Sequence, residues 1–144
     1  MKTYLVTGAA GFIGSNFVKY LLKKYGEDIQ IIIVDALTYA GNLASIKDEI
    51  ELDNVSFVKS DIADYETIKS VFTNNDIDYV VNFAAESHVD RSITNPKLFL
   101  ETNIIGTQNM LQCAREAWYV GKDEMGSPVY KDGVKYLQIS TDEV

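Results

Sequence analysis

Cysteine, histidine and proline are scarce in this chain of 144 residues, which has one cysteine, one histidine and two prolines. The single cysteine, Cys113, excludes an internal disulfide and a multi-cysteine metal site, so we expect no metal and a reducing compartment. No apolar run approaches the ~20 residues of a membrane helix. Gly8 and Gly11 interrupt the amino terminus where a signal peptide would need its apolar core. We therefore expect a cytoplasmic protein without membrane contact.

Basic residues are also few, because 13 Lys and Arg residues stand against 21 Asp and Glu residues, for a net charge of −8. Broad binding to nucleic acid or to an anionic membrane needs a Lys/Arg-rich surface that neutralises phosphates, so neither partner is expected. The composition, with 47% apolar residues, is typical of a globular chain and excludes a disordered or fibrous one. The length fits one domain over residues 1–144.

Apolar runs of strand length alternate along the chain with segments of helical periodicity. The strands are predicted over residues 4–6, 29–34, 55–58, 79–83 and 136–139, the helices over 12–22, 65–72 and 96–118, and the loops over 38–54, with a short helix, and 120–133. Continuous apolar strands joined by helices indicate strands buried on both faces. The pattern predicts an α/β fold, a Rossmann-type doubly wound parallel sheet.

The last predicted strand is followed at once by the end of the chain. Domain boundaries usually fall in flexible linkers. We therefore expect an incomplete Rossmann domain in residues 1–144, truncated after strand five.

Three glycines follow the first predicted strand at the spacing Gly-x-x-Gly-x-x-Gly. Gly8 can form the tight turn, Gly11 can let the backbone approach a pyrophosphate, and Gly14 can let the next helix pack closely on the sheet. The amino terminus of that helix offers free N–H groups and the positive end of the helix dipole to an anion. The pattern favours a phosphate-binding turn, although three glycines also fit a plain strand-to-helix connection.

Polar and small residues stand at the carboxyl ends of the next strands, where ligands bind in this architecture. Asp35 closes the second strand, 21 positions after Gly14, where a carboxylate accepts hydrogen bonds from a ribose hydroxyl and repels a 2′-phosphate. NAD is therefore favoured over NADP, although Asp35 also fits a capping or turn residue. Asp61 is placed to take an adenine amino group. Ala84 and Ala85 leave room for a ribose or nicotinamide, or else reflect tight packing.

The sequence resembles the extended short-chain dehydrogenase/reductase family, and within it the sugar-nucleotide dehydratases. The resemblance rests on TGAAGFIG at 7–14, DALTYAGN at 35–42, AAESHVDRS at 84–92, TN at 102–103 and STDEV at 140–144. It covers the whole chain but only the amino-terminal part of such an enzyme. The substrate-binding carboxyl-terminal region, and a Tyr-x-x-x-Lys pair that starts the sugar oxidation, would then lie outside these residues. Tyr20 and Lys24 have that spacing by coincidence on the first predicted helix.

The resemblance implies the following contacts with NAD. Phe12 and Ile13 would lie over the pyrophosphate, and Asp35 and Thr38 would hold the adenosine ribose. The remaining contacts would come from Asp61, Ile62, Phe83, Ala84, Ala85, Glu86, Ser87 and Thr102, the first two of these at the adenine.

The same resemblance implies that the enzyme dehydrates a nucleotide-activated hexose to its 4-keto-6-deoxy form and works as a homodimer. Ser87 and Thr141 would touch the hexose, Asp142 would protonate the departing C6 hydroxyl, and Glu143 would remove the C5 proton. Elimination of water needs one acid and one base, and two neighbouring carboxyl groups can be tuned to different pKa values for these roles. His88 is expected to be structural rather than catalytic.

Two other interpretations remain. A non-catalytic NAD-binding module would share the phosphate-binding turn but would have no turnover. A nucleotide-sugar epimerase would share the fold, but it needs no elimination acid and base at Asp142 and Glu143.

Overall fold

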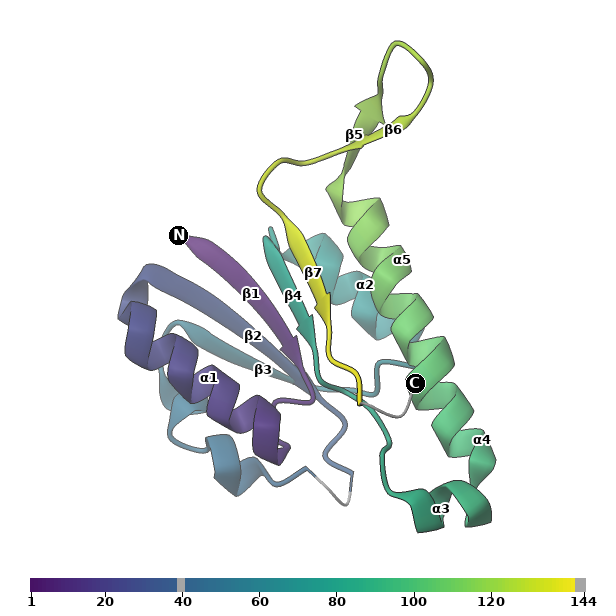
Figure 1. Cartoon of the computed structure of the whole chain (residues 1–144). Helices are drawn as coiled ribbons and strands as arrows, with labels where there is room; N and C mark the ends of the chain where they lie inside the picture. The colour runs from purple at the N-terminus through teal and green to yellow at the C-terminus, as the bar shows by residue number, and fades with distance from the viewer. Residues whose placement is uncertain (39–40, 142–144) are drawn as a thin grey trace.

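A five-stranded parallel sheet forms the centre of the molecule (Figure 1), in a computed structural model that describes residues 1–38 and 41–141. The strand order is β3-β2-β1-β4-β7, and all four neighbouring pairs are parallel. The strands are β1 (Lys2–Thr7), β2 (Ile29–Asp35), β3 (Val55–Lys59), β4 (Tyr79–Asn82) and β7 (Lys135–Gln138). The predicted doubly wound parallel fold is confirmed, with each predicted strand within two residues of its observed bounds.

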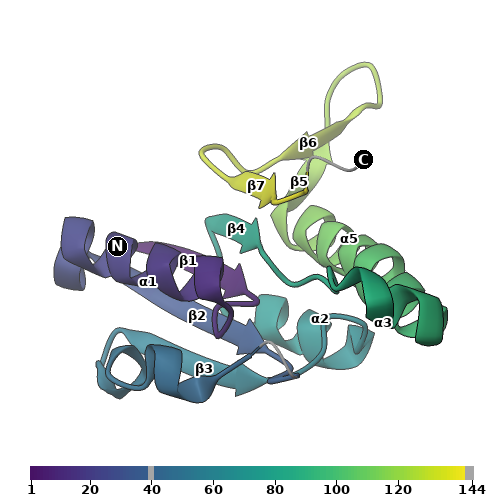
Figure 2. The ribbon, with the colours of Figure 1, turned by 60° about the horizontal axis from the view of Figure 1, so that its bottom comes forward.

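Helices cover both faces of this sheet (Figure 2). On one face, α1 (Phe12–Tyr25) packs with the 3₁₀ turns η2 (Leu43–Ile46) and η3 (Glu49–Glu51), and a third turn, η1 (Gly26–Asp28), precedes β2. The other face carries α2 (Tyr65–Asn74) and α5 (Thr107–Trp118). The helices that follow β1 and β4 lie on opposite faces, so the change of face falls between these two neighbouring strands, which is where ligands bind in such sheets.

The helix predicted over residues 96–118 is one continuous run with an irregular centre. It comprises α4 (Pro96–Phe99), the π-helical segment η4 (Leu100–Gly106) and α5, and the junction residues Leu100 and Thr107 keep helical backbone angles. A π-helical segment widens the turn, and here it ends at Gly106, which packs against Ile62. A methyl group added at Gly106 would lie 2.7 Å from Ile62 Cδ1.

Two apolar layers form the core, one on each side of the sheet. The layer under α1 includes Ile31, Ile33 and Val18, and the layer under α2 and α5 includes Ile32, Val80 and Met110. Successive residues of β2 therefore enter opposite layers, as the side-chain alternation of a strand requires. This double burial explains why β2 is an unbroken apolar run.

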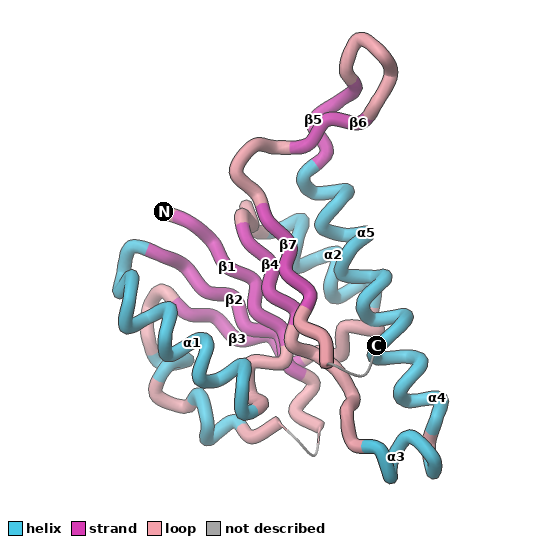
Figure 3. The backbone as a smooth tube through the Cα atoms, in the orientation of Figure 1, coloured by secondary structure: helices cyan, strands magenta, loops and turns pink. Residues whose placement is uncertain are grey.

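Two elements differ from the sequence-based expectation. The predicted loop over residues 120–133 contains an antiparallel hairpin, β5 (Tyr119–Lys122) and β6 (Pro128–Tyr130), which projects from the end of α5 (Figure 3). A short helix, α3 (Val89–Thr94), follows β4. Both are short and largely exposed, so neither leaves the apolar periodicity that reveals buried elements.

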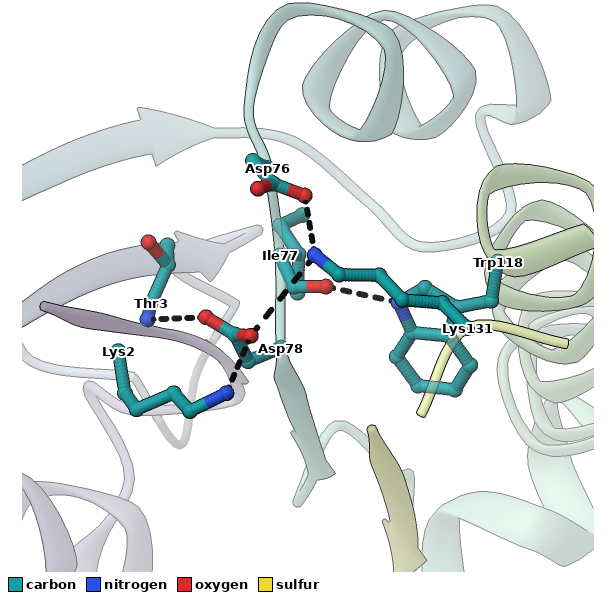
Figure 4. Close-up of polar contacts among 7 residues, drawn as sticks. All are labelled: Lys2, Thr3, Asp76, Ile77, Asp78, Trp118 and Lys131. Carbon is teal, nitrogen blue, oxygen red and sulfur yellow. Dashed lines mark hydrogen bonds and ion pairs between the residues drawn. The ribbon is translucent and has the colours of Figure 1, made fainter. Parts of the chain in front are cut away.

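Charged side chains connect the segment after β6 to the amino-terminal ends of β4 and β1 (Figure 4). Asp78 accepts hydrogen bonds from Lys2 Nζ at 2.8 Å and from the Thr3 N–H at 3.0 Å, and Lys131 Nζ lies 2.7 Å from an oxygen of Asp76. Burial alone would raise the pKa of Asp78, but these hydrogen bonds and the charges of Lys2 and Lys131 outweigh it and hold the pKa below its ordinary value.

Within residues 1–38 and 41–141, no helix is both long enough and apolar enough to cross a bilayer. In the same part of the chain, no three His, Cys, Asp or Glu side chains are grouped so that they could hold a metal ion.

Candidate functional site

The loops that follow β1, β2, β3 and β4 meet at the carboxyl edge of the sheet, between the amino terminus of α1 and the long helix (Figure 3). Most of the residues that the sequence analysis selected lie in these loops. The topology therefore brings together segments that are far apart in the chain.

The glycine-rich turn after β1 is built by close backbone contacts. Gly8 has a φ of +67°, a left-handed conformation that favours glycine. A methyl group at Gly8 would lie 2.7 Å from the backbone nitrogen of Ala84, so the turn also rests on the loop after β4. Gly14 packs against the carbonyl of Gly8 and, more loosely, against Ala9. Gly14 therefore lets the first turn of α1 lie directly against the turn that leaves β1.

The amino terminus of α1 carries the features of an anion site. Gly11 is the N-cap residue with extended backbone angles, and it supplies no side chain to cap the helix. The first backbone N–H groups of a helix have no partner within the helix. Phe12 and Ile13 are 85% and 64% exposed although both are apolar. A pyrophosphate fits here, because it would bind the N–H groups while the rest of a dinucleotide covered these two side chains.

Asp35 joins the end of β2 to the glycine-rich turn. Its side chain is 8% exposed, and its two oxygens accept hydrogen bonds from the N–H groups of Ala10 and Leu37, both at 2.8 Å. Asp35 is thus at the carboxyl edge beside the phosphate-binding turn, as the spacing from Gly14 requires. Thr38 is exposed nearby.

The loop after β3 is held in place by the long helix. Asp61 forms a turn by accepting a hydrogen bond from the Ala63 N–H at 2.9 Å. Ile62 is 2% exposed as a whole residue, and its side chain lies in the core rather than in the site. Asn109 donates hydrogen bonds to the carbonyls of Ile62 and Ala63 at 3.0 and 3.1 Å. The sequence analysis gave Asn109 no role.

The loop after β4 is held by a second asparagine of the long helix. Asn103 accepts a hydrogen bond from the Glu86 N–H and donates one to the Glu86 carbonyl, both at 2.8 Å. Glu86 is 6% exposed, whereas Ala85 and Ser87 on either side of it are exposed. The sequence analysis quoted Asn103 in a motif without assigning it a contact. Thr102, one residue earlier, is 9% exposed beside this loop.

A row of polar side chains crosses three strands directly below the site. Thr7, Asn82 and Gln138 occupy matched positions in β1, β4 and β7. The Thr7 hydroxyl donates to Asn82, and the Asn82 amide donates to Gln138 Oε1 at 2.8 Å. The Tyr136 hydroxyl also donates to Gln138, and burial raises the pKa of Tyr136 to about 12, although Asn82 lowers it in part. The row fixes β7 beside β4, and β7 leads to Ser140 and Thr141.

The residues proposed for chemistry are only partly described. Thr141 is exposed just beyond β7. Asp142 and Glu143 lie outside the described residues.

Phe83, expected to contact NAD, is partly buried and packs against the α1 side of the core, with its ring 5.3 Å from that of Phe17.

A groove of about 480 Å³ lies at the opposite end of the sheet, between the carboxyl ends of α2 and α5. It includes Cys113, whose pKa is raised to about 11 by burial and further by the charge of Glu116. A thiol with such a pKa is a poor nucleophile near neutral pH. The groove is far from the glycine-rich turn, and we assign the chemistry to the carboxyl edge on the basis of its backbone donors and Asp35.

Comparison with known proteins places these features in a family. A family profile described as GDP-mannose 4,6 dehydratase matches residues 5–144. The chain belongs to this family. It is therefore an extended short-chain dehydrogenase/reductase, and the resemblance noted in the sequence is confirmed.

Members of this family with known names or structures are similar to the chain over its full length. It is 44% identical to the dTDP-glucose 4,6-dehydratase of Xanthomonas campestris pv. campestris, covering 100% of the chain and 39% of that protein. A dTDP-glucose 4,6-dehydratase from Bacillus anthracis, solved in complex with NAD, gives a TM-score of 0.78 at 39% identity, over 100% of the chain and 39% of the structure.

A second solved relative binds two ligands. The dTDP-glucose 4,6-dehydratase of Streptomyces venezuelae, with NAD and TYD bound, gives a TM-score of 0.73 at 46% identity, over 80% of the chain and 36% of the structure. The two relatives that align with the whole of this chain are longer, and the chain spans about 39% of the length of each. It is homologous to their amino-terminal, NAD-binding region.

Proposed function

We propose that the protein containing this chain is an NAD-dependent lyase that dehydrates dTDP-glucose to the 4-keto-6-deoxy sugar. In this proposal residues 1–144 are its cofactor-binding part. The observation that carries the proposal is the uncapped amino terminus of α1, set beside the Asp35 carboxylate at the carboxyl edge of a Rossmann sheet. The names of the similar proteins support the choice of substrate.

The residues of the site fit an NAD molecule. The backbone N–H groups at Phe12 and Ile13 would bind the pyrophosphate, and Asp35 with Thr38 would hold the adenosine ribose. The adenine would lie at Asp61 and Ile62, with Asp61 as the accessible contact because Ile62 is 2% exposed. The nicotinamide half would follow the loop after β4, that is, Phe83, Ala84, Ala85, Glu86 and Ser87, together with Thr102.

The charge of Asp35 favours NAD over NADP. The carboxylate accepts hydrogen bonds from ribose hydroxyls, whereas a 2′-phosphate would place like charges in contact in a partly buried site. NAD bound here would supply a hydride acceptor at C4 of the sugar and a hydride donor for C6.

The chain contributes an acid and a base to the elimination. Asp142 would deliver a proton to the departing C6 hydroxyl, and Glu143 would take the proton from C5. That C5 proton becomes acidic only beside a C4 ketone, so oxidation must precede elimination. Ser87 and Thr141, both exposed at the carboxyl edge, would hold the hexose. The role of Ser87 rests on the motif at residues 84–92, and the other three roles rest on the motif at residues 140–144.

The long helix offers a surface for a second copy of the chain. Its apolar residues Leu100, Ile104 and Leu111 are 55%, 58% and 48% exposed along one run of helix. A contiguous exposed apolar patch marks an interaction site, and we assign it to the homodimer implied by the resemblance to the family.

Two measurements on the full-length protein test the proposal. Calorimetric titration should give tighter binding of NAD⁺ than of NADP⁺, and equal affinities would contradict the role of Asp35. Single-turnover mixing with dTDP-glucose should show that Asp142→Asn and Glu143→Gln slow elimination by about 10²–10⁴-fold, so that NADH absorbance accumulates. A variant that forms no NADH would contradict the assigned roles.

The same experiments separate the two other interpretations. A non-catalytic module would bind NAD⁺ without consuming dTDP-glucose. An epimerase would invert C4 of its sugar and release no water, and Asp142→Asn would leave its turnover unchanged.

A further inference from the structure

Asp35 has hydrogen-bond partners within the protein itself. A carboxylate at the end of the second strand is expected to wait for ribose hydroxyls. In this structure both of its oxygens already accept backbone hydrogen bonds at 2.8 Å, from Ala10 in the glycine-rich turn and from Leu37 in the loop after β2. The carboxylate therefore bridges two ligand-binding loops.

The peptide groups on both sides of Ala10 are held by the loop after β2. The Ala10 N–H donates to Asp35, and the Ala10 carbonyl accepts from the Asn42 N–H at 3.1 Å. Ala10 immediately precedes Gly11, the N-cap of α1, and is 1% exposed. Fixing Ala10 therefore fixes the direction of the first N–H groups of α1, which are the proposed pyrophosphate donors.

The loop after β2 adopts a conformation that depends on this carboxylate. Leu37 has a φ of +53°, a left-handed conformation that residues other than glycine rarely adopt. Its N–H bond to Asp35 holds it there. A methyl group at Gly41 would lie 2.9 Å from Asp35 Oδ1, so the loop closes around the carboxylate only because residue 41 is glycine.

We infer that Asp35 is a positioning residue for the diphosphate, acting through Ala10 and the amino terminus of α1, in addition to any contact with the ribose. The inference rests on the proposed function, because it concerns the same NAD site. It predicts that loss of the carboxylate weakens binding of a diphosphate whether or not the ligand carries ribose hydroxyls.

The direction in which Asp35→Asn changes the diphosphate affinity distinguishes the positioning role of Asp35 from a simple effect of its charge. Replacing a carboxylate near an anionic diphosphate removes a like-charge repulsion, so a purely Coulombic effect of Asp35→Asn strengthens binding. Loss of a contact that positions the loop lowers the fraction of molecules whose glycine-rich turn is competent to bind, and so weakens diphosphate binding. The two effects have opposite directions.

The test compares ADP with 2′,3′-dideoxy-ADP by calorimetry on the full-length protein. Asp35→Asn should weaken binding of both ligands by at least about fivefold, with a larger loss for ADP. Asp28→Asn, the same charge change at an exposed site on η1, should leave both affinities unchanged. Unchanged or tighter binding of the dideoxy ligand by Asp35→Asn would overturn the inference.

A second variant keeps the carboxylate and its charge. Gly41→Ala crowds Asp35 Oδ1 and should also weaken binding of both ligands. In the ligand-free protein, amide exchange at Ala10 should be faster in both variants than in the wild type, and equal exchange rates would overturn the inference. If the wild type binds neither ADP nor NAD⁺, the proposed function fails. If the wild type binds both but only the ADP affinity responds to Asp35→Asn, the proposed function stands and the positioning role of Asp35 is overturned.

Discussion

Replacing Asn103 by alanine should loosen the loop that carries Ala84 to Ser87 without disturbing the core. The Asn103 side chain makes two hydrogen bonds of 2.8 Å to the backbone of Glu86, one as acceptor and one as donor. At about 0.5–1.5 kcal/mol each, the pair contributes about 1–3 kcal/mol to keeping this loop on the long helix. Loss of that free energy corresponds to about 5- to 150-fold faster opening.

Amide exchange at Glu86 in the full-length protein measures this opening directly. The matched control is Asn74→Ala on α2, where the side chain makes one exposed hydrogen bond to Ser70. We expect exchange at Glu86 to accelerate within that range in Asn103→Ala and to stay at the wild-type rate in Asn74→Ala. NAD⁺ affinity should fall only in the first variant. Wild-type exchange at Glu86 in Asn103→Ala would refute the reasoning.

Three further predictions concern the scaffold. The pKa of Asp78 is lower in the folded state than in the unfolded state, so the Asp78 carboxylate stabilises the fold above about pH 4. This contribution is lost as the pH falls through the folded-state pKa, so acid titration should destabilise the wild type more than Asp78→Asn. Gly106→Ala should cost about 1–3 kcal/mol by overpacking against Ile62, visible as a lower thermal midpoint. Trp118→Phe removes the buried 2.7 Å bond to the Ile77 carbonyl and should cost about 1–3 kcal/mol in urea unfolding.

The sheet and the position of the site could be predicted because buried elements leave a strong pattern. Residues 29–34 are apolar without a break since β2 is covered on both faces, and Asp35 follows at the carboxyl edge. The glycine spacing marked the turn because Gly8 needs a left-handed backbone.

The rest depended on contacts that no local pattern reveals. Asn103 and Asn109 act on loops 17 and 46–47 residues away in the chain, and an asparagine on a helix looks the same whether it faces solvent or a backbone. The β5–β6 hairpin carries no buried face, so its residues resemble a loop. The turn role that the sequence left open for Asp35 matches its hydrogen bond from the Leu37 N–H, but the bond from Ala10 could not be predicted, because Ala10 lies 25 residues away in the chain.

We propose that this chain holds the cofactor of an enzyme that oxidises a hexose at C4 and reduces it at C6. The most direct test is to incubate the full-length protein with dTDP-glucose carrying deuterium at C4 and to locate the deuterium in the product by NMR. We expect a 4-keto-6-deoxy sugar with the deuterium at C6 and no net NADH. Unchanged dTDP-glucose, or a product in which the hydrogen added at C6 comes from solvent and no deuterium is found at C6, would contradict this proposal.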